Sequence, residues 1–301
     1  MFAYRHAFHA GNHADVLKHL TLVTTLSLMQ KKDVPLWIID THAGAGLYNL
    51  TSPLVRDKAE WASGIGRLWK AESLPAGLGK YMELVRAFNP KGKLAHYPGS
   101  PLLIERMLRT EDRLRAFEMH PSDIGPLQRS LGGGPRQVKA ERKDGFTQLK
   151  AMLPPASRRG MVLMDPPYEM RDDYRLVIQS LRDALARFAN GVYLLWYPRI
   201  GRYQVERLLR QIAGLPIQQL LHLRLTVRAP LRDGLGLAGS GMIVINPPYG
   251  LAPAMDQLMP TLVQHLGQDN RARGEVRQAD SPAEIKTALS PRGPSAASGP
   301  E

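Results

Sequence analysis

The tetrapeptide Asp165-Pro166-Pro167-Tyr168 follows an apolar run and has residue types suited to methyl transfer onto an exocyclic amine. The lone pair of such an amine is delocalised into the base ring, which makes the nitrogen a poor nucleophile. A carboxylate and a backbone carbonyl, each accepting one N–H, would hold the amine and direct that lone pair. We therefore predict that Asp165 and the Pro166 carbonyl hold an adenine N6, while Tyr168 stacks on the extruded base. The simpler alternative is that the prolines only end a strand.

A second proline pair, Asn246-Pro247-Pro248-Tyr249, also follows an apolar run. An amide can replace the carboxylate in this kind of motif, so the sequence offers two candidates. We prefer the Asp165 copy because it follows the fourth strand, which in the usual order lies beside the cofactor-binding first strand. The Asn246 copy follows the last strand of the body, where a proline pair most simply ends the sheet.

A second candidate feature is a set of small and acidic residues at predicted strand ends. Small residues follow the first strand in the run DTHAGAG at 40–46, where they permit close backbone approach to a nucleoside cofactor. The third glycine of the dinucleotide fingerprint is missing. Glu118, after the second strand, is the expected acceptor for ribose hydroxyls, and Asp144, followed by Gly145 and Phe146, is the expected partner of the adenine amino group. Together these strand ends predict one cofactor site.

Three further patterns carry weaker signals. A complete G-x-G-x-x-G at 234–239 precedes a strand and opens no helix, so we interpret it as a hairpin or flexible loop. His9 and His13 have the spacing of a zinc pair, but no acid or cysteine cluster accompanies them, and we expect no metal. Residues 199–233 contain seven arginines against two acids, which is typical of a phosphate-binding face or of a solvated helix surface.

The composition limits the class of protein and its partners. The 301 residues include 40 Lys and Arg against 27 Asp and Glu, giving a formal charge of +13, and no cysteine, which excludes disulfides and cysteine nucleophiles. The ten basic and acidic residues in 267–301 cancel, so the excess lies in 1–266. It favours a polyanion partner, with ordinary solubility charge as the alternative. The apolar run at 20–29 is too short to span a bilayer and lacks a cleavage pattern, so we expect a soluble cytoplasmic protein.

Strand-like runs alternate with helix-like stretches, which predicts an α/β fold with a parallel, doubly wound sheet. The expected strands are 36–40, 113–118, 137–140, 161–165, 191–196 and 242–246, with 220–228 as an edge strand. The expected helices are 15–30, 101–108, 174–187 and 204–213. The first two strands are unusually far apart, so we interpret about 47–96 as a small helical insertion. Residues 267–301 are rich in Ala, Ser, Gly and Pro, and we expect a disordered tail.

At these motifs the chain resembles the RlmJ family of bacterial 23S ribosomal RNA adenine-N6 methyltransferases. The resemblance covers about residues 1–265 and rests on YRH at 4–6, FHAGNHADVLKH at 8–19, DTHAGAG at 40–46, YPGSP at 97–101, HPSD at 120–123, DPPYEM at 165–170 and SGMIVINPP at 240–248. It implies a class I methyltransferase fold (Rossmann-like, with a mostly parallel seven-stranded sheet) over 1–266 and S-adenosylmethionine as the cofactor. It also implies Asp165 as the catalytic acceptor, Tyr4 against the RNA, and a cofactor surrounded by His19, His42, Ser100, Glu118, Asp144, Gly145 and Asp165.

The prediction is an S-adenosylmethionine-dependent enzyme that methylates N6 of a specific adenine in 23S ribosomal RNA, as a monomer without a metal or a membrane partner. Catalysis would come from positioning and electrostatics, because the methyl donor is already activated. Two alternatives stay open at this point. One is a DNA adenine-N6 methyltransferase, and the other is a non-catalytic ribosomal RNA-binding protein on the same fold.

Overall fold

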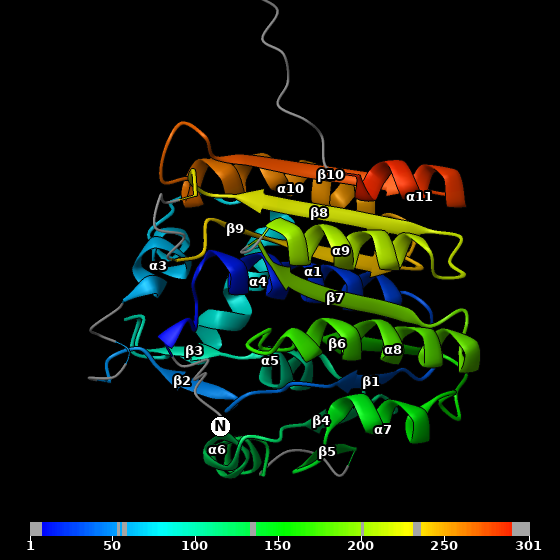
Figure 1. The fold of residues 1–301 in the computed structure, drawn as a ribbon. Helices are drawn as coiled ribbons and strands as arrows, with labels where there is room; N and C mark the ends of the chain where they lie inside the picture. Colours follow the sequence, from blue (N-terminus) through cyan, green and yellow to red (C-terminus); the bar gives the residue numbers. More distant parts are fainter. Residues whose placement is uncertain are drawn as a thin grey trace, which may run out of the picture.

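The structure, a computed structural model, describes residues 8–52, 55, 59–132, 137–199, 202–230 and 236–290. Its main sheet has eight strands, which are β1 (Trp37–Asp40), β4 (Arg113–Phe117), β5 (Val138–Glu141), β6 (Gly160–Met164), β7 (Val192–Pro198), β8 (Leu220–Thr226), β9 (Gly239–Ile245) and β10 (Arg273–Ala279). They lie in the order β10-β8-β9-β7-β6-β1-β4-β5 (Figure 1). Every strand expected from the sequence is present, with ends shifted by a few residues.

The sheet is mostly parallel, as predicted. The pairs β4–β5, β1–β4, β1–β6 and β6–β7 are parallel, whereas β9 is antiparallel to both β7 and β8, and β10 is antiparallel to β8. The mostly parallel α/β class is thus confirmed, but the sheet has eight strands where seven were expected. The carboxyl ends of β1, β4, β5 and β6 meet at one edge, which we call the carboxyl edge.

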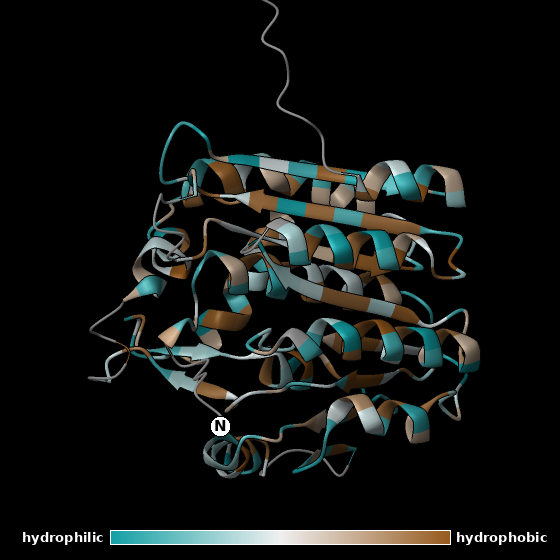
Figure 2. Cartoon of the chain, in the orientation of Figure 1, coloured by the Kyte–Doolittle hydropathy of each residue, from teal (hydrophilic) through white to brown (hydrophobic). Residues whose placement is uncertain are grey.

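The predicted disordered tail is wrong as far as residue 290. β10 pairs with β8 along its whole length, and α11 (Pro282–Leu289) buries Ile285 and Leu289. Because β10 takes the edge of the sheet, β8 is an inner strand and not the expected edge strand. Figure 2 shows that much of β10 is hydrophilic. Strand pairing relies on backbone hydrogen bonds, so a polar, aromatic-free segment can still form an edge strand. Residues 291–301 lie outside the described residues.

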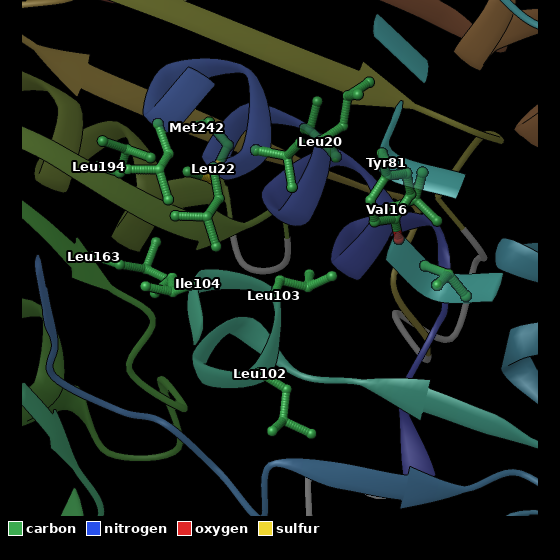
Figure 3. Close-up of a cluster of buried hydrophobic side chains, with 14 of the residues drawn as sticks. Val16, Leu20, Leu22, Tyr81, Leu102, Leu103, Ile104, Leu163, Leu194 and Met242 are labelled. Carbon is green, nitrogen blue, oxygen red and sulfur yellow. The ribbon is translucent and has the colours of Figure 1, made fainter. Parts of the chain in front are cut away.

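Helices cover both faces of the sheet. One face carries α1 (His13–Met29), α4 (Ala76–Ala87), α5 (Ser100–Met107), α6 (Pro121–Leu131) and α10 (Leu251–Leu266), and the other carries α7 (Gly145–Met152), α8 (Arg171–Arg187), α9 (Arg202–Ala213) and α11. Figure 3 shows the first core, where Leu22 of α1 lies near Leu194 and Met242, and Ile104 of α5 lies near Leu163. Within the described ranges, no helix combines the length and apolar character that crossing a membrane requires.

The expected insertion lies between β1 and α5 and contains more than helices. Besides α4, it has η2 (Glu60–Ser63), α3 (Ile65–Trp69) and an antiparallel pair, β2 (Leu47–Asn49) with β3 (His96–Pro98). It lies at the carboxyl edge (Figure 1). The Tyr97 hydroxyl lies 2.8 Å from the Tyr81 hydroxyl and 2.7 Å from His19 Nδ1, all buried. The insertion is therefore tied directly to α1 beside the predicted site.

Candidate active site

A cavity of about 300 Å³ lies at the carboxyl edge. Parallel pairing brings the residues that follow four strands to this edge, as expected for a ligand site in such a sheet. The predicted site residues that line it are His19, His42, Ser100, Glu118, Asp144, Gly145, Asp165 and Pro166. Tyr168 does not line it, and Tyr4 lies outside the described residues.

The lining is acidic although the chain as a whole is strongly basic. Counted over the described residues, it holds one lysine, Lys18, and the six carboxylates of Glu118, Asp123, Asp144, Asp165, Glu169 and Asp173. The whole chain, by contrast, has a formal charge of +13. The field inside the cavity therefore favours a cationic ligand and opposes a phosphate.

The glycine-containing loop after β1 is tied to the end of β4. Gly44 has a φ of 62°, and a Cβ there would lie 2.2 Å from the Tyr48 hydroxyl, so the position requires glycine. The Gly44 N–H donates to Glu118 Oε2 at 2.8 Å, and the His120 N–H donates to Oε1 at 2.6 Å. Burial raises the pKa of Glu118, against the opposing effect of these two donors. Each carboxylate oxygen still has a lone pair that can accept a ribose hydroxyl.

The turn between β5 and α7 packs directly against the loop after β1. A Cβ at Gly145 would lie 2.1 Å from the Thr41 carbonyl oxygen, so only glycine permits this approach. Asp144 caps α7, accepting the Phe146 N–H at 3.0 Å and the Thr147 hydroxyl at 2.6 Å. The cap holds the Asp144 carboxylate at the cavity wall.

Two buried titratable groups lie at the end of β1. The His42 ring packs edge-on against Phe146, with centroids 4.7 Å apart, and burial lowers the pKa of His42 to about 4. His42 is therefore neutral at pH 7. Asp40 accepts a hydrogen bond from Ser100 Oγ at 2.7 Å, and burial raises the pKa of Asp40 to about 7 despite that bond. Of these two groups, only His42 lines the cavity, and it adds no positive charge there at pH 7.

Lys18 is a site residue that the sequence reasoning missed. Its buried ammonium pairs with Asp15 Oδ1 at 2.7 Å and with Asp165, and lies 6.0 Å from the centre of the Trp196 ring. Burial alone would lower the pKa of Lys18, but the two carboxylates outweigh it and raise the pKa above its ordinary value. The available signal was the Asp15–Lys18 spacing of three on a helix that has no other Asp, Glu, Lys or Arg, since a buried lysine needs a buried acid.

Tyr168 lies in the core and not at the cavity. Its φ is 53°, its side chain is 6% exposed, and its hydroxyl donates to the Trp196 carbonyl at 2.8 Å. Its ring centre lies 4.6 Å from that of Tyr174 and 6.0 Å from that of Trp196. The expected stacking face is therefore covered in this structure. The left-handed backbone at this position, which the sequence did not reveal, directs the ring into the second core.

The second proline pair lies at the other end of the strands, opposite the carboxyl edge. β9 runs antiparallel to β7, and its last residue, Ile245, pairs with Tyr193 near the start of β7. The Asn246 amide donates to the carbonyls of Ala189 and Gly191, both at 2.7 Å. By contrast, β6 lies beside β1, as expected for the strand that carries Asp165. These placements support the choice of the Asp165 copy.

The N-terminal histidines contact protein groups. His9 Nδ1 lies 2.9 Å from Glu60 Oε2, and His13 Nε2 lies 3.1 Å from the Leu237 carbonyl in the loop between β8 and β9. Burial lowers the pKa of His13 to about 4. Across the described parts of the chain, no three His, Asp or Glu side chains gather closely enough to hold a metal ion.

One known family and several known proteins match this chain. Residues 33–278 match the family described as "Ribosomal RNA large subunit methyltransferase D, RlmJ". The chain is 46% identical over 266 residues to the ribosomal RNA large subunit methyltransferase J of Escherichia coli K12, which covers 88% of this chain and 94% of that protein. The protein of the same name from Haemophilus influenzae is 42% identical over 267 residues, with the same coverage. A crystal structure of a Legionella pneumophila protein matches with a TM-score of 0.82 and 30% identity, covering 91% of this chain and 98% of that chain.

Proposed function

We propose that this chain, which belongs to the RlmJ family of ribosomal RNA large subunit methyltransferases, is an adenine-N6 methyltransferase. It would transfer a methyl group from S-adenosylmethionine to N6 of an adenine in 23S ribosomal RNA. The observation that carries the proposal is an acidic cavity at the carboxyl edge, into which Asp165 projects beside a buried lysine. The same cavity also contains the residues that the resemblance implies for the cofactor.

The charge of the cavity fits the proposed cofactor. S-adenosylmethionine carries a sulfonium and an ammonium cation against one carboxylate, so its net charge is positive, and the lining has six carboxylates to one lysine. When bound, it supplies an activated methyl group on sulfur. Glu118 would accept its ribose hydroxyls and Asp144 its adenine amino group. His42, neutral at pH 7, adds no positive charge that would repel the sulfonium.

Asp165 and Pro166 would hold the target amine. The carboxylate accepts one N–H and the Pro166 carbonyl the other, which keeps the nitrogen lone pair directed at the methyl group. As the new N–C bond forms, the C–S bond would break with its electron pair returning to sulfur, and the Asp165 carboxylate would stabilise the cationic nitrogen until it releases a proton to water. Lys18 fixes the carboxylate through their ion pair. Catalysis then rests on position and electrostatics and needs no proton removal before attack.

Tyr168 and Tyr4 were both expected to contact the RNA, and their proposed roles differ. The buried position of Tyr168 does not support stacking on the base. Its hydrogen bond to Trp196 supports instead a role in fixing the turn that presents the Pro166 carbonyl. Tyr4, outside the described residues, is proposed as an RNA contact on the resemblance alone.

Methyl transfer from labelled cofactor tests the proposal. The purified chain is incubated with tritiated S-adenosylmethionine and either naked 23S RNA or adenine-containing duplex DNA, and the digested nucleic acid is separated by chromatography. We expect label in N6-methyladenosine from RNA and none in DNA. Label in DNA, or at another RNA atom, would reject the proposed substrate. Tight RNA and cofactor binding without any transfer would favour the non-catalytic alternative.

A further inference from the structure

Four arginines gather around one carboxylate on the antiparallel half of the sheet, outside the cavity. Arg224 of β8 faces Glu275 of β10 in register, and both Arg224 and Arg277 pair with Glu275 Oε2. Arg273 Nε lies 3.8 Å from Glu275 Oε1. Arg199, directly after β7, donates to the hydroxyl of Thr226, the β8 residue that pairs with Arg273. We call these five residues the arginine cluster.

The arginine cluster has an excess of positive charge in a partly buried setting. The side chains of Arg224 and Arg277 are only 10% and 12% exposed, and Glu275 is 22% exposed, whereas Arg273 is 57% exposed. Four guanidinium groups against one carboxylate repel one another, and partial burial strengthens that repulsion because the local dielectric constant is low. The buried Nε of Arg224 also has no hydrogen-bond partner among the described residues. An anion bound at the surface of the cluster would relieve the repulsion between the guanidinium groups.

The cluster lies at the same edge of the sheet as Asp165. Met164, the residue before Asp165, pairs with Leu195 of β7, and β7 continues past it toward Arg199. Thr226, the last residue of β8, pairs with Arg273, the first of β10. β10 lies four strand positions from β6, which is about 20 Å at the usual spacing.

The cluster lies on one face of the sheet near the carboxyl edge, and its side chains are exposed to different extents. Alternation places Arg224 and His222 on one face of β8, opposite Leu221, Leu223 and Leu225 of the first core. That is the face of α9 and α11. Figure 1 shows α9 lying between β7 and β8, and the end of α11 meets the cluster, because Arg277 Nη1 donates to the carbonyls of Ala288 and Ser290 at 3.2 and 3.3 Å. The outer arginines are Arg273, which is 57% exposed, and Arg199, which is half-buried, so a ligand approaches the cluster from the side of Arg273.

We propose that the arginine cluster binds phosphodiester groups of the RNA strand that carries the target adenine. The proposal rests on the proposed function in needing an RNA substrate. Guanidinium groups match phosphate oxygens in charge and geometry, whereas the acidic cavity would repel the RNA backbone. Arg199 and Arg273 make the contacts, and Arg224 and Arg277 hold Glu275 and add charge behind them. The acidic cavity would therefore bind the cationic cofactor, and the arginine cluster would bind the polyanionic RNA.

The test removes the two outer charges and measures how RNA binding depends on salt. For Arg199→Gln/Arg273→Gln we expect the KM for a 23S RNA fragment to rise about tenfold, with kcat and cofactor affinity unchanged. The slope of log affinity against log salt should fall by about one to two, because each lost phosphate contact removes roughly 0.7 to 1. Arg210→Gln, at an exposed position in the last turn of α9, is the matched control and should leave both quantities unchanged.

Other outcomes separate the possible roles of the cluster. Arg199→Lys/Arg273→Lys should retain most of the salt slope, because it keeps both charges. A double Gln variant that melts earlier but keeps the KM and the salt slope would overturn the proposal and leave the cluster as a structural ion network. If wild-type protein methylates no RNA, the proposed function fails separately, because the salt slope of RNA binding is measured without catalysis.

Discussion

The two proline-pair turns have nearly the same sequence but opposite surroundings. Each follows a buried strand, and each contains a residue with positive φ, Tyr168 at 53° and Asn246 at 54°. Asp165 meets Lys18 beside the cavity, whereas Asn246 donates to backbone carbonyls at the other edge. The tyrosine of the first turn is 6% exposed, and Tyr249 of the second is 102% exposed. Strand direction separates them, because β6 runs parallel to β1 and β9 antiparallel to β7.

The largest expected effect tests whether only the first turn is catalytic. Asp165→Ala should lower kcat about a thousandfold, since it removes the group that holds and stabilises the reacting amine. Asn246→Ala should leave kcat within about twofold but reduce the free energy of unfolding by about 1–3 kcal/mol, because two carbonyls lose their donor. Single-turnover methyl transfer measures the change in rate, and thermal melts measure the change in stability. A large loss of kcat in a normally stable Asn246→Ala would remove the distinction between the turns.

A second test compares Asp40, an ionisable group buried at the carboxyl edge, with the uncharged amide of Asn246 at the opposite end of the strands. Burial raises the pKa of Asp40 from 3.8 to about 7, so the native state keeps a proton that the unfolded chain releases near pH 4. Its contribution to stability is therefore full below pH 4 and is lost as the pH rises to 7. Asp40→Asn should gain stability relative to wild type across this range, by up to about 4 kcal/mol. Urea unfolding at pH 4.5, 6 and 7.5 measures the difference, and a constant difference would contradict the assignment.

The smallest expected effect compares the two tyrosines. Tyr168→Phe removes the hydrogen bond to the Trp196 carbonyl and should lower the free energy of unfolding by about 1–2 kcal/mol. Tyr249→Phe, at a fully exposed position, should change it by less than about 0.5 kcal/mol. Denaturant unfolding of the two variants gives the comparison directly. Equal effects would mean that the turns are structurally alike after all.

Local sequence patterns predicted seven of the eight strands of the main sheet and most of the cavity residues, but of the helices only α1, α5, α8 and α9 were located. Apolar runs ending in an acid located β1 and β6, and the acids Glu118 and Asp144 were predicted at the same edge because parallel strands bring their carboxyl ends together. Composition misjudged β10, since its residues have no apolar pattern and its stability comes from pairing with β8. Lys18 was missed because its second partner, Asp165, meets it only when α1 packs against the end of β6, although its first partner, Asp15, lies on the same helix.

By itself, the sequence determined which residues are able to do chemistry, because residue type and the strand before each motif are local properties. Tertiary structure decided which of the two proline pairs reaches the cavity, because strand direction depends on pairing between distant segments. It also turned Tyr168 into the core and brought Arg273 and Arg277 beside Arg199 and Arg224. Charge balance along the chain made the last 35 residues appear irrelevant to the basic excess. Folding placed two of their arginines, Arg273 and Arg277, in one cluster with Arg199 and Arg224, since electrostatic interaction depends on distance in space and not on position in the sequence.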